Sequence, residues 1–386
     1  IMQVLAGDSL RGRGNGSPDL LKAGHYILDH FRKAGLVPLP GSMSFFHAFL
    51  PFGGPKENKR DQLAWNGRSI KAKDFIYLSV VPGTYEAREL NGFQVIHADS
   101  FSREMLTQYN AIDRNLLIWT NATGNDQLKL EEIQAPAGGI QNARLLVYAD
   151  DAPVSVLLAP NQSYYNSVEY NIVGVLPGLS IPGEQIVFSA HYDHEGVTES
   201  GADRILNGAN DNASGTTALL MLADYFALRK DNARTIIFCA FAGEELGLKG
   251  STEMAEQMDT RKIKAGINLE MLGIPQYGKK KVFITGSRYS RLPNILGREF
   301  KQQGLKLVKE PNEEKQLYKR SDNYPFAEKG VTFHTIMASD DDDDCYHDPC
   351  DEIERIDMDN LAFIIRAIAA GSRGLIGGVE SGVGSR

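Results

Sequence analysis

The fold class is decided by residues 185–194, which read QIVFSAHYDH. The run begins as a short apolar stretch, typical of a strand buried inside a sheet, and polar side chains follow where that strand ends. A helical pattern comes next at Ser214–Leu228, and a second apolar strand pattern follows at Thr235–Phe241. Strands that alternate with helices in this way predict an α/β fold around a mostly parallel central sheet.

The same alternation continues on both sides of this stretch. Near the N-terminus, Ser17 and Pro18 are typical of a helix start and Gly35 of a helix end. We therefore expect a three-layer sandwich, with helices on both faces of a mixed, mostly parallel sheet. Further strands are expected at Asn171–Leu176, Ala265–Leu269, Val282–Thr285 and Val331–Met337, and further helices at Leu292–Gln303 and Asp359–Ala370.

An inserted β-rich module interrupts this pattern. Turn-rich polar stretches separate its short strands, and the dipeptide Asn66-Gly67 is typical of a tight hairpin. The expected organisation is a main domain of residues 1–45 and 166–386, with residues 46–165 inserted in it. The strands of the module are expected at Phe75–Val81, Phe93–His97, Leu116–Thr120, Arg144–Tyr148 and Val154–Ala159.

Charge and hydropathy argue against two classes of partner. The chain carries 41 Lys and Arg against 49 Asp and Glu, a formal charge of −8. An acidic surface disfavours nucleic acid or an anionic membrane as the main partner. No run reaches the roughly 18 apolar residues that a membrane span needs. The sequence therefore predicts no nucleic-acid partner and no membrane span.

Ionisable side chains gather at the predicted strand ends, where ligands bind in sheets of this kind. Imidazoles and carboxylates suit zinc, and one carboxylate can also bridge a pair of metal ions. Each of these short motifs alone is equally typical of a surface hydrogen bond or a helix cap. Their order along the chain and their shared place at strand ends favour a metal site. The side chains that follow predicted strands are His191, Glu244, Glu245, Glu270 and His347, and Asp211 joins them from the segment before the helix that begins at Ser214.

The motifs around these side chains resemble those of the M28 family of zinc peptidases, whose members use two co-catalytic metal ions. The resemblance covers residues 10–45 and 170–370 and implies that the main domain is a zinc peptidase domain. The matching segments are SAHYDH at 189–194, NGANDNASG at 207–215, AGEELG at 242–247, INLEMLG at 267–273, SDNYPF at 321–326 and YH at 346–347.

The resemblance implies two zinc ions per chain. One would be held by His191, Asp211 and Glu270, and the other by Asp211, Glu245 and His347, so that Asp211 bridges them. The family usually has Asp where this chain has Glu270. The longer side chain can still ligate from a backbone set further back, and the alternative is that it leaves one zinc site empty.

Three further side chains receive roles from the same resemblance. Glu244 would be the general base that takes a proton from zinc-activated water. Asp193 would hydrogen-bond the far nitrogen of His191 and so fix its tautomer. His194 is not expected to bind metal, and a structural or solvent-facing role is expected for it.

The cysteines bear on the compartment. Cys345 and Cys350 flank His347 as in secreted aminopeptidases of this family, where the two are joined in a disulfide; a reduced pair is the alternative. The bond would imply an oxidising compartment. We therefore expect an extracytoplasmic protein, secreted or periplasmic, whose signal peptide has been removed. Cys239 lies in an apolar strand pattern, where a buried thiol is expected.

The acidic run Asp340–Asp344 is open to three interpretations. A solvated acidic loop is the expected one. The alternatives are a carboxylate at the mouth of the site that binds the α-ammonium of a substrate, and a weak calcium site.

The resemblance implies a zinc-dependent exopeptidase acting on peptides or small amino-acid-derived substrates, with an aminopeptidase as the expected type. A carboxypeptidase or dipeptidase is the first alternative, and would need a basic group such as Arg288, Arg291 or Arg320 to hold a free carboxylate. A glutaminyl-cyclase-like acyltransferase is a second alternative, against which His191 argues. A non-catalytic binding ectodomain is a third, against which ligand-type side chains at all five metal positions argue.

Overall fold

The computed structural model of the protein describes residues 1–42, 44–49, 51, 62–71, 73–78, 93–102, 105, 108–109, 112, 114–121, 130, 144–159, 168–311 and 313–379. The chain forms two compact units, one of Ile1–Leu39 with Glu169–Arg386 and the other of Pro40–Val168. The predicted module, residues 46–165, lies within the second unit. Of the helices in the described ranges, none combines the length and hydrophobicity that crossing a membrane requires.

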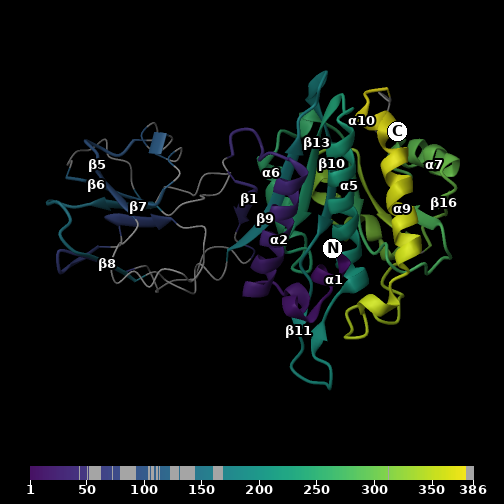
Figure 1. The fold of residues 1–386 in the computed structure, drawn as a ribbon, viewed down its shortest axis with the longest axis horizontal. Coiled ribbons are helices and arrows are strands. Elements are labelled where there is room, and N and C mark those ends of the chain that lie inside the picture. The colour runs from purple at the N-terminus through teal and green to yellow at the C-terminus, as the bar shows by residue number, and fades with distance from the viewer. Residues whose placement is uncertain are drawn as a thin grey trace. The chain divides into compact units, whose positions relative to one another are not determined.

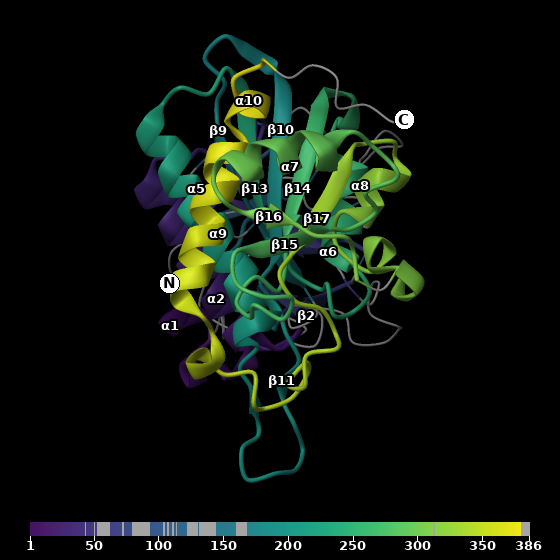
Figure 2. The same cartoon turned by 90° about the vertical axis from the view of Figure 1, so that its right-hand side faces the viewer.

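The larger unit is built on a mixed sheet (Figures 1 and 2). Neighbouring strands run parallel from β13 through β10 and β14 to β17, whereas β9 pairs antiparallel with β13, and β15 with β17. In order across the sheet, the strands of this unit are β9 (Glu169–Leu176), β13 (Arg234–Phe241), β10 (Ile181–His191), β14 (Ile263–Leu269), β17 (Phe333–Met337), β15 (Lys281–Ile284) and β16 (Lys306–Leu307).

Helices cover both faces of this sheet. In Figure 2, α5 and α9 lie to the left of the strands and α6 and α8 to the right. The helices of the larger unit are α1 (Met2–Leu5), α2 (Pro18–Ala34), α5 (Gly215–Arg229), α6 (Lys249–Gln257), α7 (Leu292–Gln302), α8 (Tyr324–Glu328), α9 (Met358–Gly371) and α10 (Arg373–Ile376). Short helical turns are η1 (Asp8–Arg13), η3 (Ala209–Ser214), η4 (Thr260–Lys262), η5 (Glu313–Lys315), η6 (Leu317–Lys319) and η7 (Ile353–Arg355).

The two faces of the sheet follow from the period of two along each strand. Every residue of β13 is buried, as expected of a central strand covered on both sides. Phe238 points to the face where Phe31 of α2 lies, with ring centroids 6.3 Å apart. Ile237, one residue earlier, belongs to the cluster that contains Phe326 of α8 on the other face. The predicted three-layer α/β fold is therefore confirmed.

The first long helix, α2, begins and ends at the predicted residues. The Ser17 side chain accepts a hydrogen bond from the backbone N–H of Leu20 at 3.2 Å, which satisfies one of the free donors at the helix start. Gly35 follows the last turn with a φ of 84°, a left-handed conformation that glycine adopts without a steric penalty.

The smaller unit has its own core and two small sheets. One is antiparallel, in the order β3-β2-β8, and the other is mixed, in the order β4-β7-β6-β5. Asn66 and Gly67 join β2 to β3 with φ angles of 51° and 75°, as the predicted hairpin requires. The strands in this unit are β1 (Phe46–Phe49), β2 (Gln62–Trp65), β3 (Arg68–Ile70), β4 (Phe75–Leu78), β5 (Gln94–His97), β6 (Leu116–Thr120), β7 (Arg144–Tyr148) and β8 (Val156–Ala159).

Candidate metal centre

The parallel strands bring the predicted site residues to one edge of the sheet. His191 is the last residue of β10, Glu244 and Glu245 follow the end of β13, and Glu270 follows β14 directly. Because carboxyl ends of parallel strands lie at the same edge, these side chains face a common space.

Asp211 lies between two histidines. Its Oδ1 lies 3.4 Å from Nε2 of His191, and its Oδ2 lies 3.1 Å from Nε2 of His347. The backbone N–H of Asp211 donates to the Asp351 carboxylate at 3.0 Å, which fixes the turn η3. Burial alone would raise the pKa of Asp211, but the adjacent imidazoles of His191 and His347 hold it well below its ordinary range. Asp211 is thus an ionised carboxylate that faces two imidazoles.

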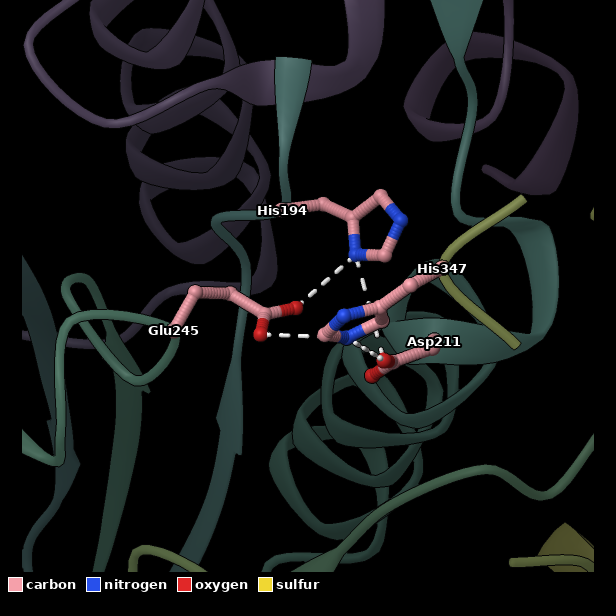
Figure 3. A group of neighbouring side chains, drawn as sticks. All are labelled: His194, Asp211, Glu245 and His347. Carbon is pink, nitrogen blue, oxygen red and sulfur yellow. Dashed lines mark hydrogen bonds and ion pairs between the residues drawn. The ribbon is translucent and has the colours of Figure 1, made fainter. Parts of the chain in front are cut away.

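Glu245 lies on the other side of His347 (Figure 3). Its Oε2 lies 3.2 Å from Nε2 of His347, and its Oε1 lies 2.9 Å from Nδ1 of His194. One potential ligand atom from each of His194, Asp211, Glu245 and His347 lies within 4.8 Å of those of the others. His347 itself has a φ of 54° and lies in a loop closed by the disulfide between Cys345 and Cys350.

Glu244 belongs to a second group of potential ligands, together with His191 and Glu245. Burial first, and the neighbouring carboxylates Glu245 and Glu270 in addition, raise the pKa of Glu244 well above its ordinary value. A cavity opens beside it, lined by Asp211, Glu244, Glu270, Met271, Leu317, Arg320, Met337, Asp341 and Tyr346.

Glu270 faces the same cavity but is held by its neighbours. Its Oε2 accepts hydrogen bonds from the Ser321 hydroxyl and, at 3.3 Å, from Nδ2 of Asn268. Burial raises its pKa to about 7. Glu270 belongs to none of the close groups of potential ligands found among the described residues.

Asp193 supports the site through the backbone. Its Oδ1 lies 3.7 Å from Nδ1 of His191, which is too long for a hydrogen bond from the carboxylate. Nδ1 of His191 lies 3.3 Å from the backbone carbonyl of Asp193, so Asp193 meets this nitrogen through its main chain. The carboxylate accepts the backbone N–H groups of Glu244 at 3.3 Å and Glu245 at 3.2 Å, and Nδ2 of Asn15 at 2.8 Å. Asp193 therefore contacts the histidine and both glutamates.

The donor set fits zinc. Nε2 of His191 is buried and has no hydrogen-bond partner within the described part of the chain, although Oδ1 of Asp211 faces it at 3.4 Å. A buried nitrogen of this kind is costly unless a cation or water completes its coordination. Imidazole nitrogens and carboxylate oxygens at such spacings are the ligands that zinc prefers in proteins.

Comparison with known proteins agrees with this chemistry. A family model described as "Peptidase family M28" matches residues 171–371, which is more than half of the chain. The chain belongs to peptidase family M28. Within the matched range lie all six ionisable side chains of the centre.

Several relatives resemble this M28 chain in sequence. It is 24% identical over 280 residues to "Aminopeptidase YwaD" of Bacillus subtilis, an alignment that spans 69% of this chain and 55% of that protein. It is 43% identical over 86 residues to a "Probable zinc metalloprotease" of Pyricularia oryzae, spanning 22% of this chain and 17% of that one. The M28 chain thus spans about half the length of the first relative, and much less of the second.

Solved structures share the fold along nearly the whole chain. A zinc aminopeptidase from Bacillus subtilis superposes with a TM-score of 0.57 and 19% identity, covering 99% of this chain and 96% of that one. An aminopeptidase from Aneurinibacillus sp. strain AM-1 gives a TM-score of 0.54 at 17% identity, covering 97% and 92%.

The structure narrows one expectation and corrects another. Of the structural and solvent-facing roles expected for His194, burial leaves the structural one: its side chain is completely buried, with Nδ1 against Glu245. The acidic run is not a simple solvated loop, because Asp340 is buried and accepts hydrogen bonds from Tyr277 and Gln276. Asp341 lines the cavity of the M28 centre and pairs with Lys315 and Arg320, which already neutralise it.

Of the three candidate arginines, Arg320 lines the cavity. Its Nη1 lies 2.8 Å from Oδ2 of Asp341. Arg288 lies instead over the exposed ring of Tyr289, with 5.0 Å from the guanidinium carbon to the ring centroid. Arg291 precedes the first turn of α7.

A buried arginine beneath the centre escaped the sequence analysis. Arg13 is completely buried, and its guanidinium donates to the backbone carbonyls of Tyr192 at 2.8 Å, Asn207 at 2.8 Å, Gly208 at 3.0 Å and Leu5. Burial lowers the pKa of Arg13 to about 10, while the nearby carboxylates oppose that shift. Arg13 joins the N-terminal segment to the two segments that carry His191 and Asp211. Its place between two glycines was the signal in the sequence.

Proposed function

We propose that the chain is a two-zinc aminopeptidase of family M28. The observation that carries the proposal is the carboxylate of Asp211, whose two oxygens face His191 and His347 on opposite sides. His191, Asp211 and Glu270 would hold one zinc ion, and Asp211, Glu245 and His347 the other. The names of the relatives, an aminopeptidase and a probable zinc metalloprotease, support the same reaction class.

Bound zinc supplies Lewis-acid chemistry, because it lowers the pKa of water towards ~7 and polarises a carbonyl. Glu244 would accept the proton of the attacking water and deliver it to the leaving amine as the C–N bond breaks and the C–O bond forms. Asp193 holds the backbone of Glu244 in place for this role.

The cavity supports a substrate with an apolar side chain. Met271, Leu317 and Met337 line it and belong to one buried cluster of apolar side chains. Such a surface gains free energy by burying apolar area of the substrate, at about 25 cal/mol per Å².

Arg320 is the observation that favours a second candidate, a carboxypeptidase or dipeptidase. A guanidinium that lines the cavity can hold a free carboxylate. Its ion pair with Asp341 weakens this role, because a substrate carboxylate would have to displace that partner. The aminopeptidase is therefore the function that we propose.

Two assays test the proposal. Release of chromophore from a panel of amino-acid anilides, compared with N-blocked anilides and C-amidated dipeptides, should require a free amine and should stop when a chelator is added. A requirement for a free carboxylate would instead support the carboxypeptidase.

Glu244→Gln should retain zinc near the wild-type content while turnover falls by about 10²–10⁴-fold, the usual contribution of general-base catalysis. Glu256→Gln, at an exposed position of α6, is the matched control and should leave both unchanged. Loss of zinc from Glu244→Gln would make Glu244 a ligand and not the base.

We also propose that the protein works in an oxidising, extracytoplasmic compartment. The disulfide between Cys345 and Cys350 supports this, because structural disulfides persist where thiols are not kept reduced. Thiol labelling of the freshly isolated, unreduced protein should modify neither cysteine.

A further inference from the structure

His194 has no role in the proposed mechanism, yet it lies inside the metal centre. Its side chain is completely buried, and its ring meets that of His347 edge-on, with centroids 5.3 Å apart and an interplanar angle of 80°. Nδ1 of His194 lies 2.9 Å from Oε1 of Glu245 and 3.9 Å from Oδ2 of Asp211 (Figure 3). The ring is therefore either a further metal ligand or a group that orients Glu245.

The two oxygens of Glu245 distinguish these roles. Oε1 faces His194 at 2.9 Å, a normal length for a hydrogen bond from an N–H donor. Oε2 faces Nε2 of His347 at 3.2 Å. The carboxylate thus offers one oxygen to each histidine, and the oxygen near His347 remains free to bind a metal ion that the same histidine binds.

The other ring nitrogen of His194 also indicates that the ring orients Glu245 and does not bind metal. Nε2 is buried and has no hydrogen-bond partner among the described residues. A histidine that bound metal through Nδ1 would carry its proton on Nε2, where ligating histidines almost always donate to a carboxylate, a carbonyl or water. An N–H left unpaired there would cost about 1–3 kcal/mol. With the proton on Nδ1, the one donor of the ring is satisfied by Glu245, and Nε2 is an acceptor that a water molecule can satisfy.

The backbone holds the ring in this position. The N–H of His194 donates to the carbonyl of Arg13 at 3.2 Å. Gly208 packs directly against the ring, and a Cβ at that position would lie 2.5 Å from Cδ2 of His194. Gly208 is itself fixed by Arg13, which donates to its carbonyl. The ring has little freedom to turn away from Glu245.

We propose that His194 is a positioning residue for Glu245. Its Nδ1–H donates to Oε1 and leaves Oε2 as the single oxygen that meets the metal ion shared with Asp211 and His347. The metal-binding consequence rests on the proposed two-zinc function, whereas the tautomer and the hydrogen bond do not.

Three substitutions at this position separate the roles. The side-chain amide nitrogen of Asn can occupy the place of Nδ1, and that of Gln the place of Nε2, whereas Ala supplies no donor. Zinc affinity is measured by competition with a chromophoric chelator, starting from metal-free protein. His194→Ala and His194→Gln should weaken one of the two zinc sites about 10–100-fold, as loss of a supporting hydrogen bond to a ligand typically does. His194→Asn should stay within about threefold of the wild type.

Two further readouts decide between outcomes. X-ray absorption of the zinc-loaded wild type should count one imidazole per zinc ion; a higher count would make His194 a ligand and overturn the proposal. Equal weakening in all three variants, with unchanged urea unfolding of the metal-free forms, would overturn it as well.

The tautomer tests the proposal without metal. In ¹⁵N-histidine spectra of the metal-free protein, the signals lost in His194→Asn should be those of an Nδ1–H tautomer, and an Nε2–H tautomer would refute the proposed hydrogen bond. A wild type that bound no zinc would contradict the two-zinc function, while this spectrum would still decide the role of His194.

Discussion

The disulfide between Cys345 and Cys350 should stabilise both the fold and the binding of zinc at His347. It spans a sequence separation of 5, and its Cα atoms lie 5.3 Å apart, within the range of unstrained disulfides. His347 lies inside the closed loop with a φ of 54°, in the left-handed region that non-glycine residues seldom occupy. Opening the loop therefore frees a segment whose backbone must be held in a disfavoured conformation at His347.

The magnitude follows from loop closure. Replacing both cysteines by serine returns the conformational entropy of a short loop to the unfolded chain, which lowers the free energy of unfolding by about 2 kcal/mol. If zinc must also order the opened loop, the same free energy opposes binding at His347. The zinc dissociation constant should then rise by up to ~30-fold, since 1.4 kcal/mol corresponds to a factor of ten.

Urea unfolding of the metal-free double serine variant, followed by far-UV circular dichroism, measures the first effect. Tryptophan fluorescence is unsuitable, because Trp65 and Trp119 are the two tryptophans of the chain and both lie in the smaller unit. Chelator competition measures the second effect. Reduced and alkylated wild type is the matched control and should behave like the variant. A variant that unfolds at the wild-type urea concentration and binds zinc with wild-type affinity would refute the reasoning.

Two further predictions concern buried groups that are not themselves zinc ligands. Burial lowers the pKa of His334 from its ordinary 6.5 to about 4. Between these two pH values the imidazole binds a proton in the unfolded chain but not in the folded one. The free energy of unfolding should therefore fall by about 3 kcal/mol as the pH is lowered from 6.5 to 4. Urea titrations at several pH values should show this loss of unfolding free energy, and the loss should be smaller in His334→Gln. The same pH dependence of the unfolding free energy in His334→Gln as in the wild type would contradict the prediction. Arg13→Met leaves four buried carbonyls without their donor and should lower the free energy of unfolding by about 3 kcal/mol or more; a loss below 1 kcal/mol would be inconsistent with the observed contacts.

The fold could be predicted from sequence because its central strands are buried on both faces. Such strands must be continuously apolar, so runs such as Thr235–Phe241 are visible in the sequence and nearly coincide with β13. The helix α2 was equally visible, because Ser17, Pro18 and Gly35 mark its two ends.

The metal centre was predictable only in part. The strand ends and the resemblance to M28 peptidases brought together the side chains that now face one another around Asp211. The supporting groups could not be found, because their partners lie far away in sequence. Arg13 binds carbonyls near residue 207, and Asp351 holds the backbone of Asp211, through contacts that no local pattern encodes.

Burial was the other limit. His194 stands in a polar motif that is typical of surface residues, yet the close approach of Gly208 and the turn held by Arg13 enclose it. The acidic run was misjudged for the same reason, because Tyr277 and Gln276, which cover Asp340, come from a distant loop.

Anomalous diffraction at the zinc absorption edge, from crystals of the zinc-loaded protein, would examine the metal centre most directly. We expect two peaks per chain, each about 2.0–2.2 Å from an oxygen of Asp211. One should also contact His191 and Glu270, and the other Glu245 and His347. A single peak, or peaks that Asp211 does not touch, would contradict the bridged pair of zinc ions.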